Sequence, residues 1–255
     1  MPTPFSHLAA ASEILALPEV GADLAGALRA EWPAFLLGNT APDVQTVSGQ
    51  SREATHFFRV PVNGALAAGP KMLARYPALA RRTDLPPAQA AFLAGYLAHL
   101  LFDQFWIRDV FEPFFGPEAH WADFRERLYL HNVLRASWDA DDLARLAPTV
   151  GAELADAQPV NWLPFVDDRH LRTWRDLIAD QLNSGAGRTV EVFAQRMHAD
   201  PQAFAALLNS PEEMQRRVFS HVPPGALAEC RAGANRASAQ AIRAYWLGEP
   251  AAPDF

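Results

Sequence analysis

Apolar residues recur at helical spacing along most of this 255-residue chain. Alanine and leucine are abundant, β-branched runs are scarce, and no stretch alternates apolar and polar positions with a period of two. Prolines fall mostly between the periodic segments, where they start or end helices. The pattern therefore predicts an all-α protein whose helices form a single domain over residues 1–255.

The positions of proline and glycine predict where these helices begin and end. Pro33 should kink or split the second helix. The segment Gly38–Asp43 should end it, because glycine and asparagine suit a helix C-cap and Pro42 prevents continuation. Pro86 and Pro87 should open a long central helix that closes between Pro113 and Pro117. The other helices are expected at 7–17, 22–37, 64–76, 119–138, 167–182, 188–198, 201–208, 211–221 and 224–247. We expect residues 1–145 to contain the metal site and residues 146–255 to form helices that cover that half.

The most apolar stretch of the chain runs from Ala90 to Phe115. It is interrupted by polar residues, namely His99, Asp103, Gln104, Arg108 and Asp109. These interruptions predict a buried helix rather than a membrane span, so no transmembrane segment is expected.

His99 and Asp103 stand out inside this apolar run. Their spacing of four places both side chains on one face of a helix, within reach of a common ion. A histidine and a carboxylate are costly in such surroundings unless they are paired or coordinated. The pair is consistent either with a salt bridge in a helix core or with part of a metal site.

Composition and charge limit the partners and the kinds of metal site that the chain can have. The net charge of −7 argues against a protein that binds nucleic acid by charge alone, so no stable nucleic-acid partner is expected. The single cysteine, Cys230, allows neither an intrachain disulfide nor a cysteine-rich zinc site. The first residues contain no basic segment followed by a long apolar one, so we expect no secretory signal and a cytoplasmic protein.

Three more polar residues look out of place in the first half. His7 lies in an otherwise apolar helix, Asp43 follows a proline in a tight turn, and His56 precedes two phenylalanines. Each has an ordinary structural explanation on its own, as a helix-end, turn or partly buried residue. Together with His99 and Asp103 they provide three imidazoles and two carboxylates, which zinc prefers when thiolates are absent.

These residues lie in motifs that resemble the zinc-dependent phospholipase C family. The pattern is an early histidine, a Gly-x-x-Ala-Pro-Asp turn, a His-Phe pair and a Gly-x-x-x-His-x-x-x-Asp helix. It is found here as His7, Gly38–Asp43, His56 with Phe57, and Gly95–Asp103. The resemblance extends to about residue 110 and implies the helical fold shared with the trinuclear zinc nucleases.

The resemblance also implies which residues bind zinc. Asp43, His56, His99 and Asp103 would hold one ion, and Asp103 would bridge to a second ion that is also bound by His7. We expect one to three zinc ions, with two as the most favoured number. A further His…His-x-x-x-Glu set serves the family's remaining ion, but His131 is followed four positions later by Arg135. His131 is retained as a candidate ligand or pocket residue.

The expected activity is hydrolysis of a small phosphoester or a phospholipid head group. The zinc cluster would activate water, and Asp43 would accept the proton of that water. The incomplete third set leaves open a zinc-binding helical scaffold or interaction protein. A third alternative is a phosphodiesterase or nuclease acting on nucleotides or single strands. Adjacent His-Asp and Gly-x-Ser-x-Gly motifs, which would indicate other hydrolases, are absent from the sequence.

Overall fold

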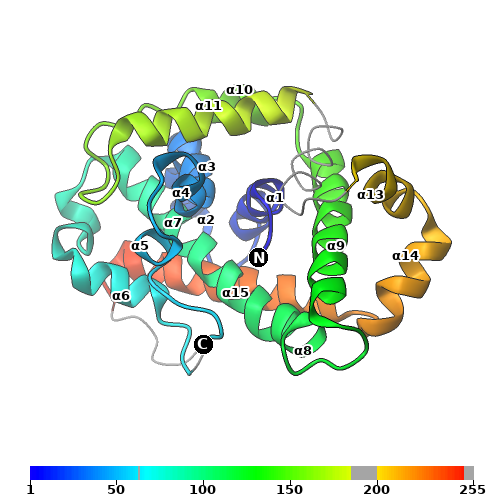
Figure 1. Ribbon diagram of the computed structural model, residues 1–255. Coiled ribbons are helices and arrows are strands. Elements are labelled where there is room, and N and C mark those ends of the chain that lie inside the picture. The colour runs from blue at the N-terminus through cyan, green and yellow to red at the C-terminus, as the bar shows by residue number, and fades with distance from the viewer. Residues whose placement is uncertain (63, 185–199, 250–255) are drawn as a thin grey trace.

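The computed structural model describes residues 1–62, 64–184 and 200–249, and all regular secondary structure within these ranges is helical (Figure 1). The all-α fold predicted from the sequence is therefore confirmed. The first half contains α1 (Pro4–Leu15), α2 (Ala22–Ala30), α3 (Trp32–Thr40), the 3₁₀ turn η1 (Ala41–Val44), α4 (Gln45–Ser48), α5 (Arg52–His56) and α6 (Ala68–Arg75). Two further 3₁₀ turns, η2 (Pro77–Leu79) and η3 (Arg82–Asp84), lead to α7 (Pro87–Trp106).

The chain continues from α7 through a π-helical turn, η4 (Ile107–Phe111), into α8 (Glu112–Phe115). The remaining elements are α9 (Phe124–Arg145), α10 (Val150–Ala155), α11 (Asp168–Ser184), α13 (Pro201–Leu208), α14 (Pro211–Arg217), η5 (Phe219–His221) and α15 (Ala226–Leu247). The helix expected at 188–198 lies outside the described residues.

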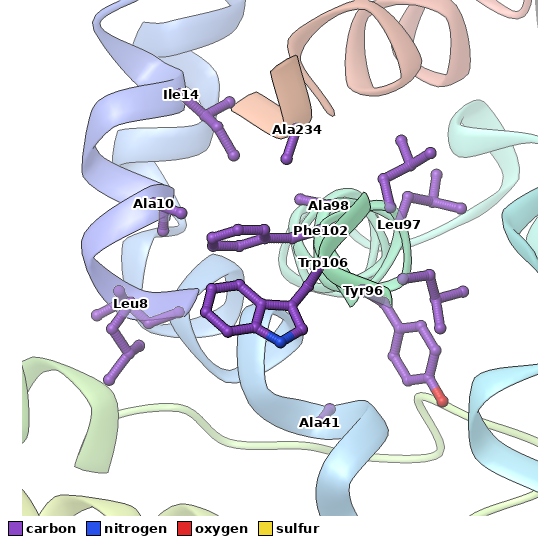
Figure 2. Packing of buried hydrophobic residues seen from close by; sticks show 14 of the residues in the cluster. Leu8, Ala10, Ile14, Ala41, Tyr96, Leu97, Ala98, Phe102, Trp106 and Ala234 are labelled. Atoms are coloured by element: carbon purple, nitrogen blue, oxygen red, sulfur yellow. The ribbon is translucent and has the colours of Figure 1, made fainter. Parts of the chain in front are cut away.

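Helix α7 is the core of the fold. Every residue from Gln89 to Trp106 is buried. The helix packs against α3 and α15 and also contacts α1. In Figure 2, α7 is seen nearly end-on, and the rings of Phe102 and Trp106 point toward α1. The stretch Pro87–Phe115 has the length and apolar composition of a membrane span, but its most apolar window is wholly buried inside the protein.

Helices α3 and α7 cross so closely that the crossing has no room for a Cβ atom. A Cβ on Gly38 would lie 2.0 Å from the carbonyl oxygen of Phe92, and one on Gly95 would lie 2.4 Å from that of Phe35. Helix α3 ends at Thr40, within the segment expected to end it, but Gly38 and Asn39 lie inside the helix, so the expectation that they cap it is wrong. Gly38 is needed for close approach of two backbones rather than for a helix cap.

Other boundaries differ from the expected ones for local reasons. The split near Pro33 is found, since α2 ends at Ala30 and α3 places Pro33 in its first turn. The helix expected over 64–76 begins only at Ala68. The helix expected from 119 begins at Phe124, where the Asp123 carboxylate accepts a hydrogen bond from the Glu126 amide. Helix-capping chemistry, rather than hydrophobic periodicity, sets this last boundary.

The second half is tied to the first through two tryptophans. The indole of Trp174 in α11 donates to the carbonyl oxygen of Thr40 at 2.8 Å, directly before η1. The indole of Trp32 in α3 donates to the carboxylate of Glu153 in α10, also at 2.8 Å. Figure 1 shows α10 and α11 lying along one side of α3. These contacts hold both ends of α3 in place, and the Trp174 contact lies where the chain turns into the candidate site.

Candidate metal centre

Four separate elements bring five candidate residues together. Helix α1 supplies His7, η1 supplies Asp43, α5 supplies His56, and α7 supplies His99 and Asp103. Two groups have ligand atoms within 4.8 Å of one another: His7, His99 and Asp103 form one, and Asp43, His56 and His99 form the other. The convergence on which the sequence interpretation depended is therefore present in the fold.

Asp103 lies at the centre of the cluster. Its Oδ1 is 3.5 Å from Nε2 of His7, and its Oδ2 is 3.3 Å from Nε2 of His56. The same Oδ2 is 3.6 Å from Nε2 of His99, one helical turn away on α7. Asp43 joins through His56, whose Nε2 lies 3.5 Å from Asp43 Oδ1. The two oxygens of Asp103 therefore face different histidines, as a carboxylate shared by two ions would.

The ligand atoms of this cluster lack hydrogen bonds. Nε2 of His7, His56 and His99 and Oδ1 of Asp103 are buried and have no hydrogen-bond partner among the described residues. All four side chains are at most 1 % exposed. An unsatisfied buried polar group costs about 1–3 kcal/mol, and four such atoms at one point need an explanation. Cations bound in the two groups would together satisfy all of them.

Backbone carbonyls set the orientation of two histidine rings. Nδ1 of His99 lies 2.8 Å from the carbonyl oxygen of Asn39, and Nδ1 of His56 lies 3.3 Å from that of Arg52. Because a carbonyl only accepts, each Nδ1 carries the proton and donates it, which leaves the Nε2 lone pair facing the cluster. The hydroxyl of Tyr96 donates to the carbonyl oxygen of Thr55 at 2.5 Å and fixes α5 against α7. The fold thus prepares both rings as Nε2 ligands.

Electrostatics favour the protonation states that a metal ion requires. Burial, reinforced by the charge of His99, lowers the pKa of His7 to about 4, so His7 is neutral at pH 7. Burial alone would raise the pKa of Asp103, but the surrounding histidines outweigh it and hold that pKa well below its ordinary value. The pKa of Asp43 is lowered for the same reason. Neutral imidazoles and ionised carboxylates fit zinc.

His56 differs, and this leads to a pH prediction. Burial opposes its protonation, but Asp103 and Asp43 outweigh burial and raise the pKa of His56 above its ordinary value. Zinc must displace that proton, so zinc affinity should fall as the pH drops from about 8 to about 6, and binding should release a proton. Calorimetric titration with zinc in buffers of different ionisation enthalpy measures the proton release. Binding without proton release throughout that range would contradict the assignment of His56 as a ligand.

His131 lies apart from both candidate groups. Its Nε2 accepts a hydrogen bond from the indole of Trp106 at 2.9 Å. Burial, with the charges of the Met1 amino group and Arg135, lowers the pKa of His131 well below its ordinary value. Because Nε2 is engaged, metal binding by His131 would need Nδ1 or displacement of Trp106. Ligation by His131 stays a prediction.

Sequence reasoning missed one residue of the cluster, Arg52. Its Nη2 donates to Oδ2 of Asp103 at 2.9 Å. The available signal was its position, since Arg52 precedes His56 by one turn of α5 and therefore shares its helix face.

A cavity of about 500 Å³ is lined in part by Phe58, and none of the five clustered residues belongs to its lining. The Phe58 ring contacts the ring of His56, with 6.1 Å between their centroids. The cavity wall also includes Gln104, which follows Asp103 on α7. Its charged lining residues are Glu53, Arg59, Lys71 and Arg75. The cavity therefore has an aromatic wall and mainly cationic charged residues, and it is separated from the clustered ligands by Phe58 and Gln104.

Comparison with known proteins agrees with this geometry. The family model described as zinc dependent phospholipase C matches residues 6–106, the segment that carries all five clustered residues. The chain matches no curated protein and no solved structure. The match supports zinc as the metal and a phospholipase-like hydrolase as the general type of protein. Residues 6–106 of this chain are therefore similar to the zinc dependent phospholipase C family.

Proposed function

We propose that this protein is a zinc-dependent hydrolase of phosphoesters. The proposal is carried by the buried, unbonded ligand atoms of His7, His56, His99 and Asp103, which converge in the segment matching the family. Zinc ions held by such a set polarise phosphoryl oxygens and lower the pKa of water to about 7. The chain itself supplies the ligands and the proton acceptor, and it excludes bulk water.

The two carboxylates take different roles in this proposal. Asp103 is 1 % exposed and surrounded by histidines, so it would serve as a buried zinc ligand. Asp43 is 16 % exposed, which makes it the carboxylate that a solvent molecule can reach. Its lowered pKa keeps it ionised, and it can accept a proton only from a water whose own pKa is also lowered. Asp43 is therefore proposed as both a ligand and the acceptor of the proton of the attacking water.

The cavity beside Phe58 is proposed to receive the organic part of the substrate. Its aromatic wall, formed by Phe57 and Phe58, suits an apolar or uncharged segment. Arg59, Lys71 and Arg75 are exposed along the same wall and outnumber the single acidic lining residue, Glu53. A small phosphoester or a phospholipid head group fits this combination of an apolar floor and cationic rim.

Metal analysis and turnover of a chromogenic phosphodiester test the proposal together. The purified protein should contain about two zinc ions per chain and hydrolyse the ester. His99→Ala and Asp43→Asn should each reduce turnover by more than about 100-fold, because each removes a direct ligand. His120→Ala and Asp156→Asn, which change exposed residues, are the matched controls. Undiminished turnover in both site variants would place the activity elsewhere.

The surroundings of His131 favour one alternative, a zinc-binding scaffold without catalysis. His131 is already bonded to Trp106, and Arg135 stands where the family's third zinc set has a glutamate. Stoichiometric zinc without turnover of any phosphoester would support the scaffold. Turnover of a dinucleotide or a single-stranded oligonucleotide alone would instead support the nuclease alternative.

A further inference from the structure

Arg52 occupies an unusual position for a cation. It is the first residue of α5, and its guanidinium reaches the central carboxylate of the cluster, with Nη2 2.9 Å from Oδ2 of Asp103. The side chain is 22 % exposed, so one part of it remains open to solvent. Its carbonyl oxygen accepts the Nδ1 proton of His56. The same residue thus supports one candidate ligand with its backbone and contacts another with its side chain.

A guanidinium beside metal ligands weakens metal binding. Arginine stays charged at every accessible pH, so it repels an approaching cation. Its hydrogen bond also draws charge from the oxygen that would bind the ion. A neutral donor would orient Asp103 without this penalty. The positive charge is therefore explained better by an anion that binds at the centre than by the metal ions alone.

The geometry of the guanidinium shows where such an anion would bind. Nε and Nη2 lie on one edge of the planar group, so their protons point in the same general direction. Nη2 is directed at Asp103, and Nε is buried and has no hydrogen-bond partner among the residues described here. Phe58 lies against the guanidinium, with its ring centroid 4.5 Å from Cζ. This cation–π contact holds the plane of the group in place.

We propose that Arg52 binds an oxygen of the substrate's phosphoryl group through its Nε–Nη2 edge, beside Asp103. This inference rests on the proposed phosphoester hydrolysis and identifies the residue that recognises the tetrahedral oxyanion. Arg52 acts on the non-bridging oxygens and neither donates nor accepts a proton in the reaction. Arg52 also contacts Phe58, a residue of the cavity lining, so the oxyanion would bind one side chain away from that cavity.

Two binding measurements separate this role from mere support of Asp103. The first is zinc affinity of the metal-free protein, and the second is the affinity of the zinc-loaded protein for inorganic phosphate, both by calorimetry. Arg52→Gln should leave zinc affinity unchanged or increase it, while phosphate affinity should fall about 10- to 100-fold. Arg52→Lys, which keeps the charge but lacks the planar Nε–Nη2 edge, should show an intermediate loss of phosphate affinity. Arg81→Gln, at an exposed arginine outside the site, is the matched control.

The opposite pattern would overturn the inference. If Arg52→Gln weakens zinc binding and leaves phosphate affinity at the wild-type value, Arg52 only orients Asp103. Because neither measurement requires turnover, the inference and the proposed function can fail separately. Arg52-dependent phosphate binding in a protein that hydrolyses no ester would uphold the oxyanion site and reject the hydrolase. Ester hydrolysis together with phosphate binding that does not depend on Arg52 would uphold the hydrolase and reject the oxyanion site.

Discussion

Replacing Gly38 with alanine is expected to unfold the protein or to destabilise it by about 3 kcal/mol or more. The new Cβ would lie 2.0 Å from the carbonyl oxygen of Phe92, far inside van der Waals contact. The backbone fixes the position of a Cβ, and the oxygen belongs to the backbone of α7, so no side-chain rotation can relieve the overlap. Helices α3 and α7 would have to separate, and this would move His99, whose Nδ1 is held by the carbonyl of Asn39. Chemical denaturation measures the loss of stability, and metal analysis of the folded fraction measures the loss of the site.

The control for this prediction is Gly26→Ala on α2. A Cβ at Gly26 would meet nothing within 4 Å, and the residue lies inside a helix. Alanine should therefore stabilise the protein by about 0.5–1 kcal/mol, through the lower backbone entropy of its unfolded state. Wild-type stability and zinc content in Gly38→Ala would show that the two helices do not need their close crossing.

Helical periodicity was enough to predict much of the fold and part of the site. It predicted that α7 is a buried helix, and the spacing of His99 and Asp103 placed their side chains together on one face. These features depend on the local sequence, because a helix has a fixed repeat. The short motifs around Asp43 and His56 then indicated the remaining partners only through the family resemblance.

The parts that were missed depend on contacts between distant segments. Gly38 was interpreted as a helix end, because nothing in the local sequence shows that Phe92 crosses at that point. The bond between Arg52 and Asp103 joins residues on two different helices. The proton on Nδ1 of His99 is fixed by a backbone carbonyl, which any residue type could supply. Such features follow from tertiary packing, and the residue types in the local sequence give little or no indication of them.

Asp103→Asn is expected to remove zinc from the site and to lower turnover by more than about 100-fold. The amide has nearly the same size as the carboxylate, but it carries no charge and offers one oxygen in place of two. Asp103 belongs to one candidate group but faces His7 of that group with one oxygen and His56 of the other group with its second oxygen, so this single change removes a ligand from the first group and a contact of His56 in the second. Zinc content per folded chain, measured by elemental analysis, is the primary readout, and turnover is the second.

Asp142→Asn is the control that separates metal loss from general damage. Asp142 is also a buried aspartate bonded to an arginine, with Oδ1 2.7 Å from Nη1 of Arg231, but it lies outside both metal groups. Its substitution should lower the melting temperature by breaking a buried pair while zinc content per folded chain stays at the wild-type value. Loss of every zinc ion in Asp103→Asn would show that one carboxylate serves the whole centre. Loss of a single ion would limit Asp103 to one site, and full retention would contradict its role as a ligand.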